Sequence, residues 1–223
     1  MTNARLTVLN RLAAFIDSVQ LDHPTRVGID GIDASGKTSL GGEVVEQLER
    51  LGRPVIPASI DRFQRQSREQ NRRGRFAPKG YYEDSFQFRA FAHELLAPLG
   101  PGGSLLYRDR VYDARADVPV HVPQSKAPAD AILVCDGVFL SRPELFTYWD
   151  VRVFIEVDFE TSMKRAIKRD WEPGLDSEAE VRALYASRFH PGYRMYLESV
   201  QPESSAHVIV HNDDLDAPTI GIR

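Results

Sequence analysis

Residues 31–38 hold the stretch most able to do chemistry, Gly-Ile-Asp-Ala-Ser-Gly-Lys-Thr, which fits the pattern G-x-x-x-x-G-K-[ST] at every fixed position. Its glycines let the backbone curl so that successive N–H groups point at phosphate oxygens. Lys37 adds a charge that can reach the β- and γ-phosphates, and the Thr38 hydroxyl can hold Mg²⁺. The pattern predicts a nucleotide site whose cofactor-binding residues are Gly31, Asp33, Ala34, Ser35, Gly36, Lys37, Thr38 and Ser39.

The segments on either side of this loop have the character that the pattern requires. Residues 26–30 are short and rich in β-formers, which predicts a buried strand, and residues 40–51 carry apolar side chains at helical spacing. The N-terminus of that helix would supply part of the anion site. The alternative is a chance Gly-Lys-Thr turn, and the agreement of pattern and setting argues against it.

Two acids stand directly after predicted strands. Asp61 follows residues 54–60, and Asp136 follows the apolar residues 131–135. In open α/β sheets ligands bind beyond the carboxyl ends of the strands. Asp61 could accept a proton from an attacking hydroxyl or help hold Mg²⁺, and the alternative is a turn or N-cap aspartate. Asp136 has the position of a Walker B acid. The predicted metal ligands are therefore Thr38, Asp61 and Asp136.

Residues 62–80 contain seven arginines and lysines among polar residues, glycine and proline. A charge run of this kind is usually a solvated loop. The alternative is a flexible, arginine-rich flap that closes over a polyanionic site. The residues alone leave both interpretations open.

Hydrophobic periodicity predicts the remaining elements. Pro57 places strand 54–60 near a sheet edge or at a bend, and the aromatic face of helix 83–97, capped by Asp84 and Ser85, is expected in the core. Residues 207–211 are expected to form the last strand, and the tail after Asp214 is polar. Strands and helices alternate, so we predict an α/β phosphate-loop NTPase fold with about five parallel strands, helices on both faces and a helical lid. The predicted helices are 2–20, 40–51, 83–97, 159–169 and 177–199, and the predicted strands are 25–30, 54–60, 131–135, 151–157 and 207–211. Residues 104–112 and 117–122 are expected to form two short strands or a hairpin, with Tyr112-Asp113 between them.

Length and composition bound the class of protein. The 223 residues suit one domain, residues 1–223, with the lid placed at 171–180. A net charge of −4 and the lack of an aromatic-basic motif argue against nucleic acid as a partner. Cys135 is the single cysteine, and no apolar stretch is long enough for a signal peptide or membrane span, which predicts a cytoplasmic protein without membrane partners. The sequence leaves open whether the protein forms a homo-oligomer.

Together these residues resemble the uridine kinase and phosphoribulokinase family of phosphate-loop kinases, over residues 25–216. The resemblance rests on six features in order: the loop, Asp61-x-Phe63, Val111-Tyr112-Asp113, Asp136-Gly137, the stretch Lys164 to Asp170, and the last strand followed by Asn212. The loop is specific for nucleotides, and the order of the others is specific for the family.

The resemblance implies roles for individual positions. Asp61 corresponds to the general base that acts on the acceptor hydroxyl, and Asp136 matches an acid that is usually glutamate. Tyr112 matches a tyrosine of the nucleoside pocket. Arg169 matches the last of the arginines that stabilise the transferring phosphoryl group, while the preceding arginine is replaced by Ala166, with Arg165 beside it. The implied catalytic residues are Asp61, Lys37, Arg169 and Arg165.

Besides Ala166, the chain departs from the family pattern in three further places. The lid lacks its Arg-Gly-Arg and has Trp171-Glu172-Pro173-Gly174 instead. The segment whose aspartate holds the ribose hydroxyls corresponds loosely to residues 80–84, where Glu83 or Asp84 would have to substitute. Asp117 replaces a histidine expected after Tyr112. The implied substrate-binding residues are Asp61, Tyr112, Asp84 and Tyr82.

Phosphoryl transfer requires mainly positioning and charge neutralisation around the γ-phosphate, and the residues above supply both. We therefore predict a kinase that uses ATP and Mg²⁺ to phosphorylate a small-molecule hydroxyl, led by uridine or cytidine. The alternative acceptors are nicotinamide riboside, pantothenate or a sugar phosphate. A nucleotide-binding regulatory protein without acceptor kinase activity is the alternative of another class, and the absence of an N-K-x-D tetrapeptide argues against a GTPase.

Overall fold

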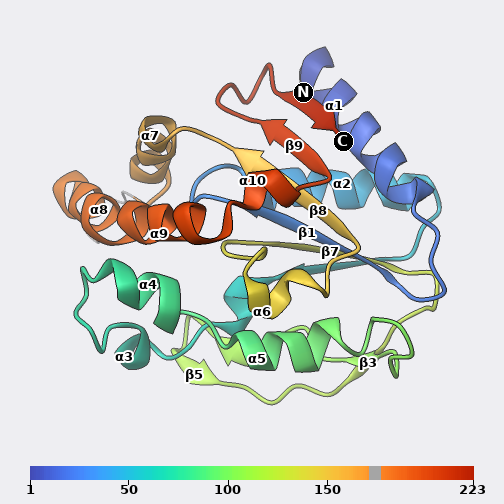
Figure 1. Cartoon of the computed structure of the whole chain (residues 1–223), viewed down its shortest axis with the longest axis horizontal. Coiled ribbons are helices and arrows are strands. Elements are labelled where there is room, and N and C mark those ends of the chain that lie inside the picture. The colour runs from blue at the N-terminus through green and yellow to red at the C-terminus, as the bar shows by residue number, and fades with distance from the viewer. Residues whose placement is uncertain (171–176) are drawn as a thin grey trace.

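The computed structural model describes residues 1–170 and 177–223. At its centre is a six-stranded sheet in the order β10-β9-β8-β1-β7-β2, in which five strands are parallel and β10 is antiparallel (Figure 1). The parallel strands confirm the predicted fold class. The strands are β1 (Thr25–Gly31), β2 (Val55–Ser59), β7 (Ile132–Gly137), β8 (Val151–Glu156), β9 (Val208–His211) and β10 (Thr219–Ile222).

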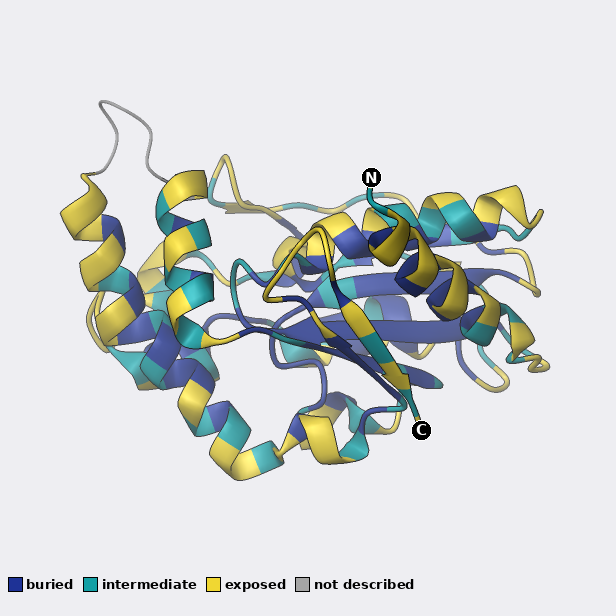
Figure 2. Ribbon diagram, turned by 90° about the horizontal axis from the view of Figure 1, so that it is seen from above, coloured by how far each residue is buried: buried dark blue, intermediate teal, exposed yellow. Residues whose placement is uncertain are grey.

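The strand order reflects how deeply each strand is buried. All seven residues of β1 are buried, as expected for a central strand covered on both faces. β2 pairs only with β7, so Pro57 stands in an edge strand as predicted. Figure 2 shows the sheet as an almost continuously buried layer between helices whose outer faces are exposed.

Helices cover both faces of the sheet. Ile29 faces α2 (Lys37–Arg50), which packs against β1, β2, β7 and α1 (Asn3–Ser18). The neighbouring Gly28 points to the other face, toward Trp149. That face is covered by α5 (Phe88–Phe91), η2 (Ala92–Leu96), α6 (Pro143–Phe146), α9 (His190–Val200) and α10 (Pro202–Ser205), and Figures 1 and 2 show α1 and α9 on opposite sides of the sheet.

The segment between β2 and β7 differs from the prediction. Residues 78–84 form a separate helix, α4 (Pro78–Asp84), and α5 begins only at Phe88. The predicted helix 83–97 is interrupted because residues 85–87 pair with residues 63–65: the Arg65 N–H donates to the Ser85 carbonyl, and the Gln87 N–H donates to the Phe63 carbonyl. The aromatic side chains of this segment lie mostly in the core, as predicted.

A short antiparallel hairpin is present in this segment as expected, but Tyr112 and Asp113 lie within its first strand and not between the strands. Tyr112 and Asp113 form strand β4 (Tyr112–Asp113), paired with β5 (Val118–Pro119), because Asp113 caps the turn between them by accepting from two backbone N–H groups. A second short pair joins β3 (Leu106–Tyr107) to β6 (Ser125–Lys126). The tail after Asp214 contains β10, which the sequence analysis missed.

The segment after β8 carries the remaining helices. α7 (Phe159–Asp170) precedes residues 171–176, and α8 (Glu178–Leu184), the π-turn η3 (Tyr185–Phe189) and α9 follow as one continuous helical run. The predicted lid substitution Trp171–Gly174 lies outside the described residues. The short helices η1 (Ile60–Phe63) and α3 (Ser67–Gln70) follow β2. None of the helices that the structure describes is both long and apolar enough to cross a membrane.

Candidate active site

The phosphate-binding loop connects the carboxyl end of β1 to the N-terminus of α2. Ala34 and Gly36 have positive φ angles of 57° and 91°. Two constraints favour glycine at position 36. Its positive φ angle is one that glycine adopts readily, and a Cβ there would lie 2.8 Å from Asn212 Nδ2. Asn212 Nδ2 donates to the Ser35 carbonyl at 2.7 Å. The residue after β9 therefore fixes the curl of the loop.

This loop forms the floor of a cavity of about 590 Å³, called here the loop cavity. Lys37 is largely buried there, and its Nζ donates to the Ile32 carbonyl at 2.6 Å. Six of the eight predicted cofactor-binding residues line the cavity. Gly31 lies in β1 and Ser35 is fully buried, so neither lines it. The lining residues are Asp33, Ala34, Gly36, Lys37, Thr38, Ser39, Asp61, Asp136, Gly137, Val138, Arg165, Lys168, Arg169 and Leu215.

Thr38 and Asp136 are brought together by the register of the sheet. Asp136 lies beside Ile29 of β1 and Ser59 of β2, so its carboxylate reaches the start of α2. Thr38 Oγ1 donates to Asp136 Oδ2 at 2.6 Å. Among the described residues no three His, Cys, Asp or Glu side chains gather in the manner of a protein cage for a metal. This fits Mg²⁺, which prefers oxygen ligands and is usually held by one or two carboxylates together with substrate phosphates and water.

Asp61 stands in η1, directly beyond the carboxyl end of β2. The N-cap of η1 is Ser59, whose hydroxyl accepts from the Asp61 N–H, so Asp61 itself is not the cap. Gln64 Nε2 donates to Asp61 Oδ1 at 3.3 Å. Water reaches the Asp61 side chain, but the surrounding protein removes much of its hydration. This desolvation raises the pKa of Asp61, the charges of Asp33 and Asp136 raise it further, and Lys37 opposes them.

A second cavity of about 440 Å³, called here the flap cavity, adjoins the first under residues 62–80. Asp33, Asp61, Val138 and Arg169 line both cavities. The two spaces therefore meet at these four side chains. The other residues that line the flap cavity are Gln64, Gln70, Asn71, Arg75, Tyr81, Ser85, Phe86, Leu184, Arg188 and Phe189.

The two predicted arginines lie on one side of α7 and line the loop cavity. Arg165 Nη2 donates to the carbonyls of Asn212 and Asp213, and Arg169 Nη2 donates to the Tyr185 hydroxyl at 2.9 Å. Ala166, which replaces a family arginine, is fully buried against Val181 and Tyr185. A long charged side chain would not fit at this position.

Three residues predicted to bind the acceptor lie outside both cavities. The Tyr112 hydroxyl donates to Asp117, the residue that replaces the expected histidine, so the two form a local contact beside β4. Asp84 accepts from Arg72 and Arg73 at 2.5 and 2.7 Å. Tyr82 packs against Arg142, whose guanidinium carbon lies 4.4 Å from the ring centre. Of the four predicted substrate residues, only Asp61 lies in the flap cavity.

The structure adds a residue that the sequence analysis missed, Tyr81. Its hydroxyl donates to Asp33 of the loop, and its ring packs edge-on against Phe189 at 4.8 Å between centroids. Burial raises the pKa of Tyr81 well above its usual value, so the hydroxyl stays protonated as a donor. The helical phase of α4 determines which of the two tyrosines reaches the site, because it turns Tyr81 toward the loop and Tyr82 toward Arg142. The phase was not predictable while residues 78–82 were not recognised as a helix.

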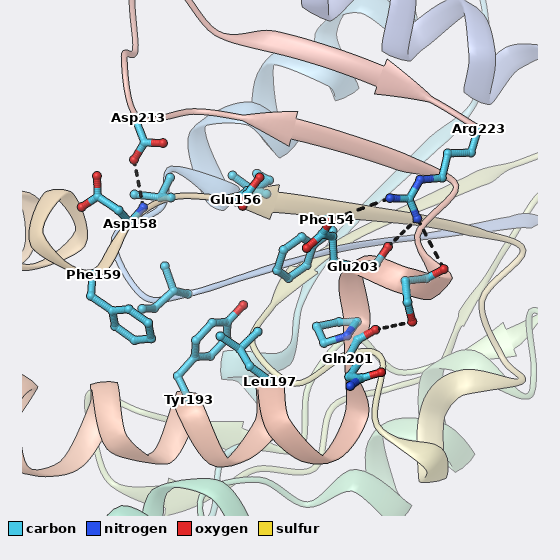
Figure 3. Close-up of a pocket in the computed structure, with 15 residues that line it drawn as sticks. Phe154, Glu156, Asp158, Phe159, Tyr193, Leu197, Gln201, Glu203, Asp213 and Arg223 are labelled. Carbon is cyan, nitrogen blue, oxygen red and sulfur yellow. Dashed lines mark hydrogen bonds and ion pairs between the residues drawn. The ribbon is translucent and has the colours of Figure 1, made fainter.

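A cavity larger than the loop and flap cavities holds none of the predicted site residues. It has a volume of about 830 Å³ and lies between α9 and the end of β8 (Figure 3). Its polar groups largely bond to one another: the Asp158 N–H donates to Asp213, and Arg223 contacts the carboxylate and the carbonyl of Glu203. Its lining includes Ile32 of the loop, but it includes neither Asp61 nor Asp136, and neither Lys37 nor the arginines of α7. We therefore do not regard it as the active site.

Comparisons with known proteins agree with this geometry. The model of a family described as "Phosphoribulokinase / Uridine kinase family" matches residues 27–214. A uridine kinase of Leuconostoc citreum is 25% identical over 180 residues, which cover 78% of this chain and 82% of that protein. The structure of a possible uridine kinase from Bacillus stearothermophilus superposes with a TM-score of 0.72 at 20% identity, covering 92% and 97% of the two chains. A phosphoribulokinase from Rhodobacter spheroides superposes with a TM-score of 0.57 at 14% identity, covering 85% and 70%.

Proposed function

Because the chain belongs to the phosphoribulokinase and uridine kinase family, we propose that it transfers the γ-phosphate of ATP to a hydroxyl of a nucleoside, with uridine or cytidine as the leading acceptors. The family makes the chain a phosphotransferase with an alcohol group as acceptor. The observation that carries the proposal is the junction of the two cavities at Asp33, Asp61, Val138 and Arg169. A phosphate bound on the loop would meet a hydroxyl held in the flap cavity at this point.

The proposed reaction assigns one task to each group. The triphosphate binds in the loop cavity, with its phosphates on the backbone N–H groups of residues 33–38 and on Lys37. Thr38 and Asp136 would hold Mg²⁺, which supplies charge neutralisation at the phosphates when bound. Arg165 and Arg169 line the same cavity, where they can stabilise charge on the transferring group.

Asp61 is placed to act as the general base. The acceptor oxygen attacks the γ-phosphorus, the bond from that phosphorus to the β,γ-bridging oxygen breaks, and the hydroxyl proton passes to the Asp61 carboxylate. ADP leaves with the bridging oxygen. A pKa raised above that of an ordinary aspartate makes the Asp61 carboxylate a stronger base.

A second class of acceptor is favoured by Arg75. This residue lines the flap cavity, and within the described part of the chain it makes no ion pair. A cation facing the acceptor space would suit an alcohol that also carries an acid group, such as a sugar phosphate or pantothenate.

The deciding experiment measures ADP formation from Mg-ATP by the purified protein against a panel of acceptors. The panel contains uridine, cytidine, other nucleosides, nicotinamide riboside, pantothenate and ribulose 5-phosphate. Stimulation by uridine or cytidine is the expected result. Stimulation only by an acidic alcohol would move the proposal to the second class, and ATP turnover that no acceptor stimulates would contradict it in favour of a regulatory role.

A further inference from the structure

Residues 70–75 form one wall of the flap cavity. Gln70, Asn71 and Arg75 line the cavity, although the segment that carries them is mostly exposed on its outer side. Only the one-turn helix α3 and short turns give this segment regular structure of its own. Its shape must therefore be fixed by contacts with another part of the molecule.

Arg188 supplies those contacts from η3. Its Nη1 donates to Asn71 Oδ1 and to the Arg75 carbonyl, each at 3.0 Å, and its Nη2 donates to the Gln70 carbonyl at 3.2 Å. The planar guanidinium can bond several oxygens at fixed angles. One side chain thus holds both ends of the wall.

Burial makes this arrangement costly. Arg188 is 4% exposed, and no carboxylate within the described residues forms an ion pair with it. Burial lowers the pKa of Arg188, but a guanidinium stays charged at neutral pH. A buried cation that is satisfied only by neutral oxygens contributes little to stability compared with an apolar side chain of similar size. The role of Arg188 is better explained by the positions in which its hydrogen bonds hold residues 70–75 than by a gain in stability.

The π-turn that carries Arg188 also contacts the rest of the site. The Tyr185 hydroxyl accepts from Arg169, and Phe189 packs against Tyr81, whose hydroxyl donates to Asp33. π-turns within α-helices often occur at functional sites because they shift the facing of neighbouring side chains. Here the contacts of three side chains of the turn, Tyr185, Arg188 and Phe189, are all with residues that line the loop cavity or the flap cavity.

We propose that Arg188 is the positioning residue for acceptor specificity, because it holds Gln70, Asn71 and Arg75 as the wall that selects the acceptor. The inference rests on the proposed function for the identity of the reaction. It moves the specificity determinants away from Tyr112 and Asp84, which lie outside the flap cavity. Arg188 acts through the wall and need not touch the reacting atoms.

The test compares Arg188→Lys and Arg188→Met with a matched control, Arg26→Met. Arg26 is also 4% exposed but pairs with Asp150 at the opposite end of β1, so its loss reports the effect of removing a buried arginine on stability alone. We expect both Arg188 variants to raise the KM of the acceptor about tenfold or more, as expected for lost hydrogen bonds to a charged group. The KM of ATP should change less than about twofold. The control should leave both KM values unchanged.

Hydrogen–deuterium exchange without acceptor separates this inference from the proposed function. Amides of residues 70–76 should exchange faster in Arg188→Met than in wild type, and should be unchanged in Arg26→Met. The exchange measurement tests the contact between Arg188 and residues 70–75 even if no acceptor in the panel is phosphorylated. Unchanged exchange in residues 70–76 would overturn the inference. An unchanged acceptor KM together with faster exchange would overturn the link to specificity.

Discussion

At the scale of single residues, the candidate site is defined by the positions of Asp33 and Asp61 between the loop cavity and the flap cavity. Asp33 and Asp61 line both spaces, and Tyr81 fixes Asp33 by donating its hydroxyl proton in a hydrogen bond. Among the described residues, the Asp61 carboxylate accepts one hydrogen bond, a weak one from Gln64 at 3.3 Å. The carboxylate of the proposed base can therefore accept a new hydrogen bond from a substrate, while Asp33 is held in place.

Replacing Asp61 by Asn should lower kcat by about 10²–10⁴-fold, because the amide cannot accept the proton. The Kd of an ATP analogue, measured by calorimetry, should change less than about twofold. In wild type, kcat/KM should fall as the pH drops through the raised pKa of Asp61, since the base must be ionised. Asp61→Asn should lack this decrease.

The control for this substitution is Glu46→Gln, which removes an exposed acid paired with Arg50 on α2. It should match wild type in kcat and in its pH profile. A kcat retained in Asp61→Asn would rule out the assignment of the base.

At the scale of elements, the flap cavity depends on the close packing of α4 on α9. Gly192 makes this possible, because a Cβ there would lie 2.8 Å from the Pro78 carbonyl oxygen and 2.9 Å from Tyr81 Cδ1. The contact sets the distance between the segment that bears Tyr81 and the helical run that bears Arg188. Asp84, at the end of α4, anchors the flap through Arg72 and Arg73.

Gly192→Ala should therefore destabilise the protein by about 1–3 kcal/mol, because backbone on the neighbouring helix must move. The matched control is Gly42→Ala on the exposed side of α2, where a Cβ would meet nothing within 4 Å. That change should be neutral or stabilise by up to about 1 kcal/mol. Urea unfolding of the two variants measures both values. Equal effects of the two substitutions would show that the α4–α9 contact is not tight.

At the scale of the whole molecule, the site is assembled where several elements end at one edge of the sheet. β1, β7 and β2 deliver the loop, Asp136 and Asp61, while α7 brings the arginines and the turn after β9 brings Asn212. The N-terminal helix joins this arrangement, since Arg5 donates to Glu43 of α2 and to the Leu215 carbonyl. A ligand bound at this point contacts several elements at once.

A non-hydrolysable ATP analogue with Mg²⁺ should accordingly stabilise the whole chain. At one hundred times its Kd, the expected gain is about 2.7 kcal/mol. For a chain of this length this raises Tm by about 5–10 °C. Thermal unfolding with and without the analogue measures the shift, and Lys37→Met should abolish it at the same concentration. An equal shift in the variant would mean that the analogue binds elsewhere.

The nucleotide half of the site could be predicted from the sequence because its signals are local. The residues of the phosphate loop are consecutive, and Asp61 and Asp136 are marked by the strands that precede them. Residues that directly follow parallel strands lie at the same edge of the sheet, so their place at the ligand-binding edge follows from the sequence pattern and the fold class. The fold class itself followed from the alternation of strands and helices.

The acceptor half could not be predicted, because it depends on contacts between distant segments. Residues 85–87 pair with residues 63–65 and divide one expected helix into two, which changes the facing of Tyr81, Tyr82 and Asp84. Arg188 meets residues 70–75 across more than one hundred positions of the chain. Periodicity reports which side of an element is buried, but not which element covers it. The sequence alone thus determined the chemistry expected of the phosphate loop, and only the tertiary structure decided which side chains line the proposed acceptor cavity.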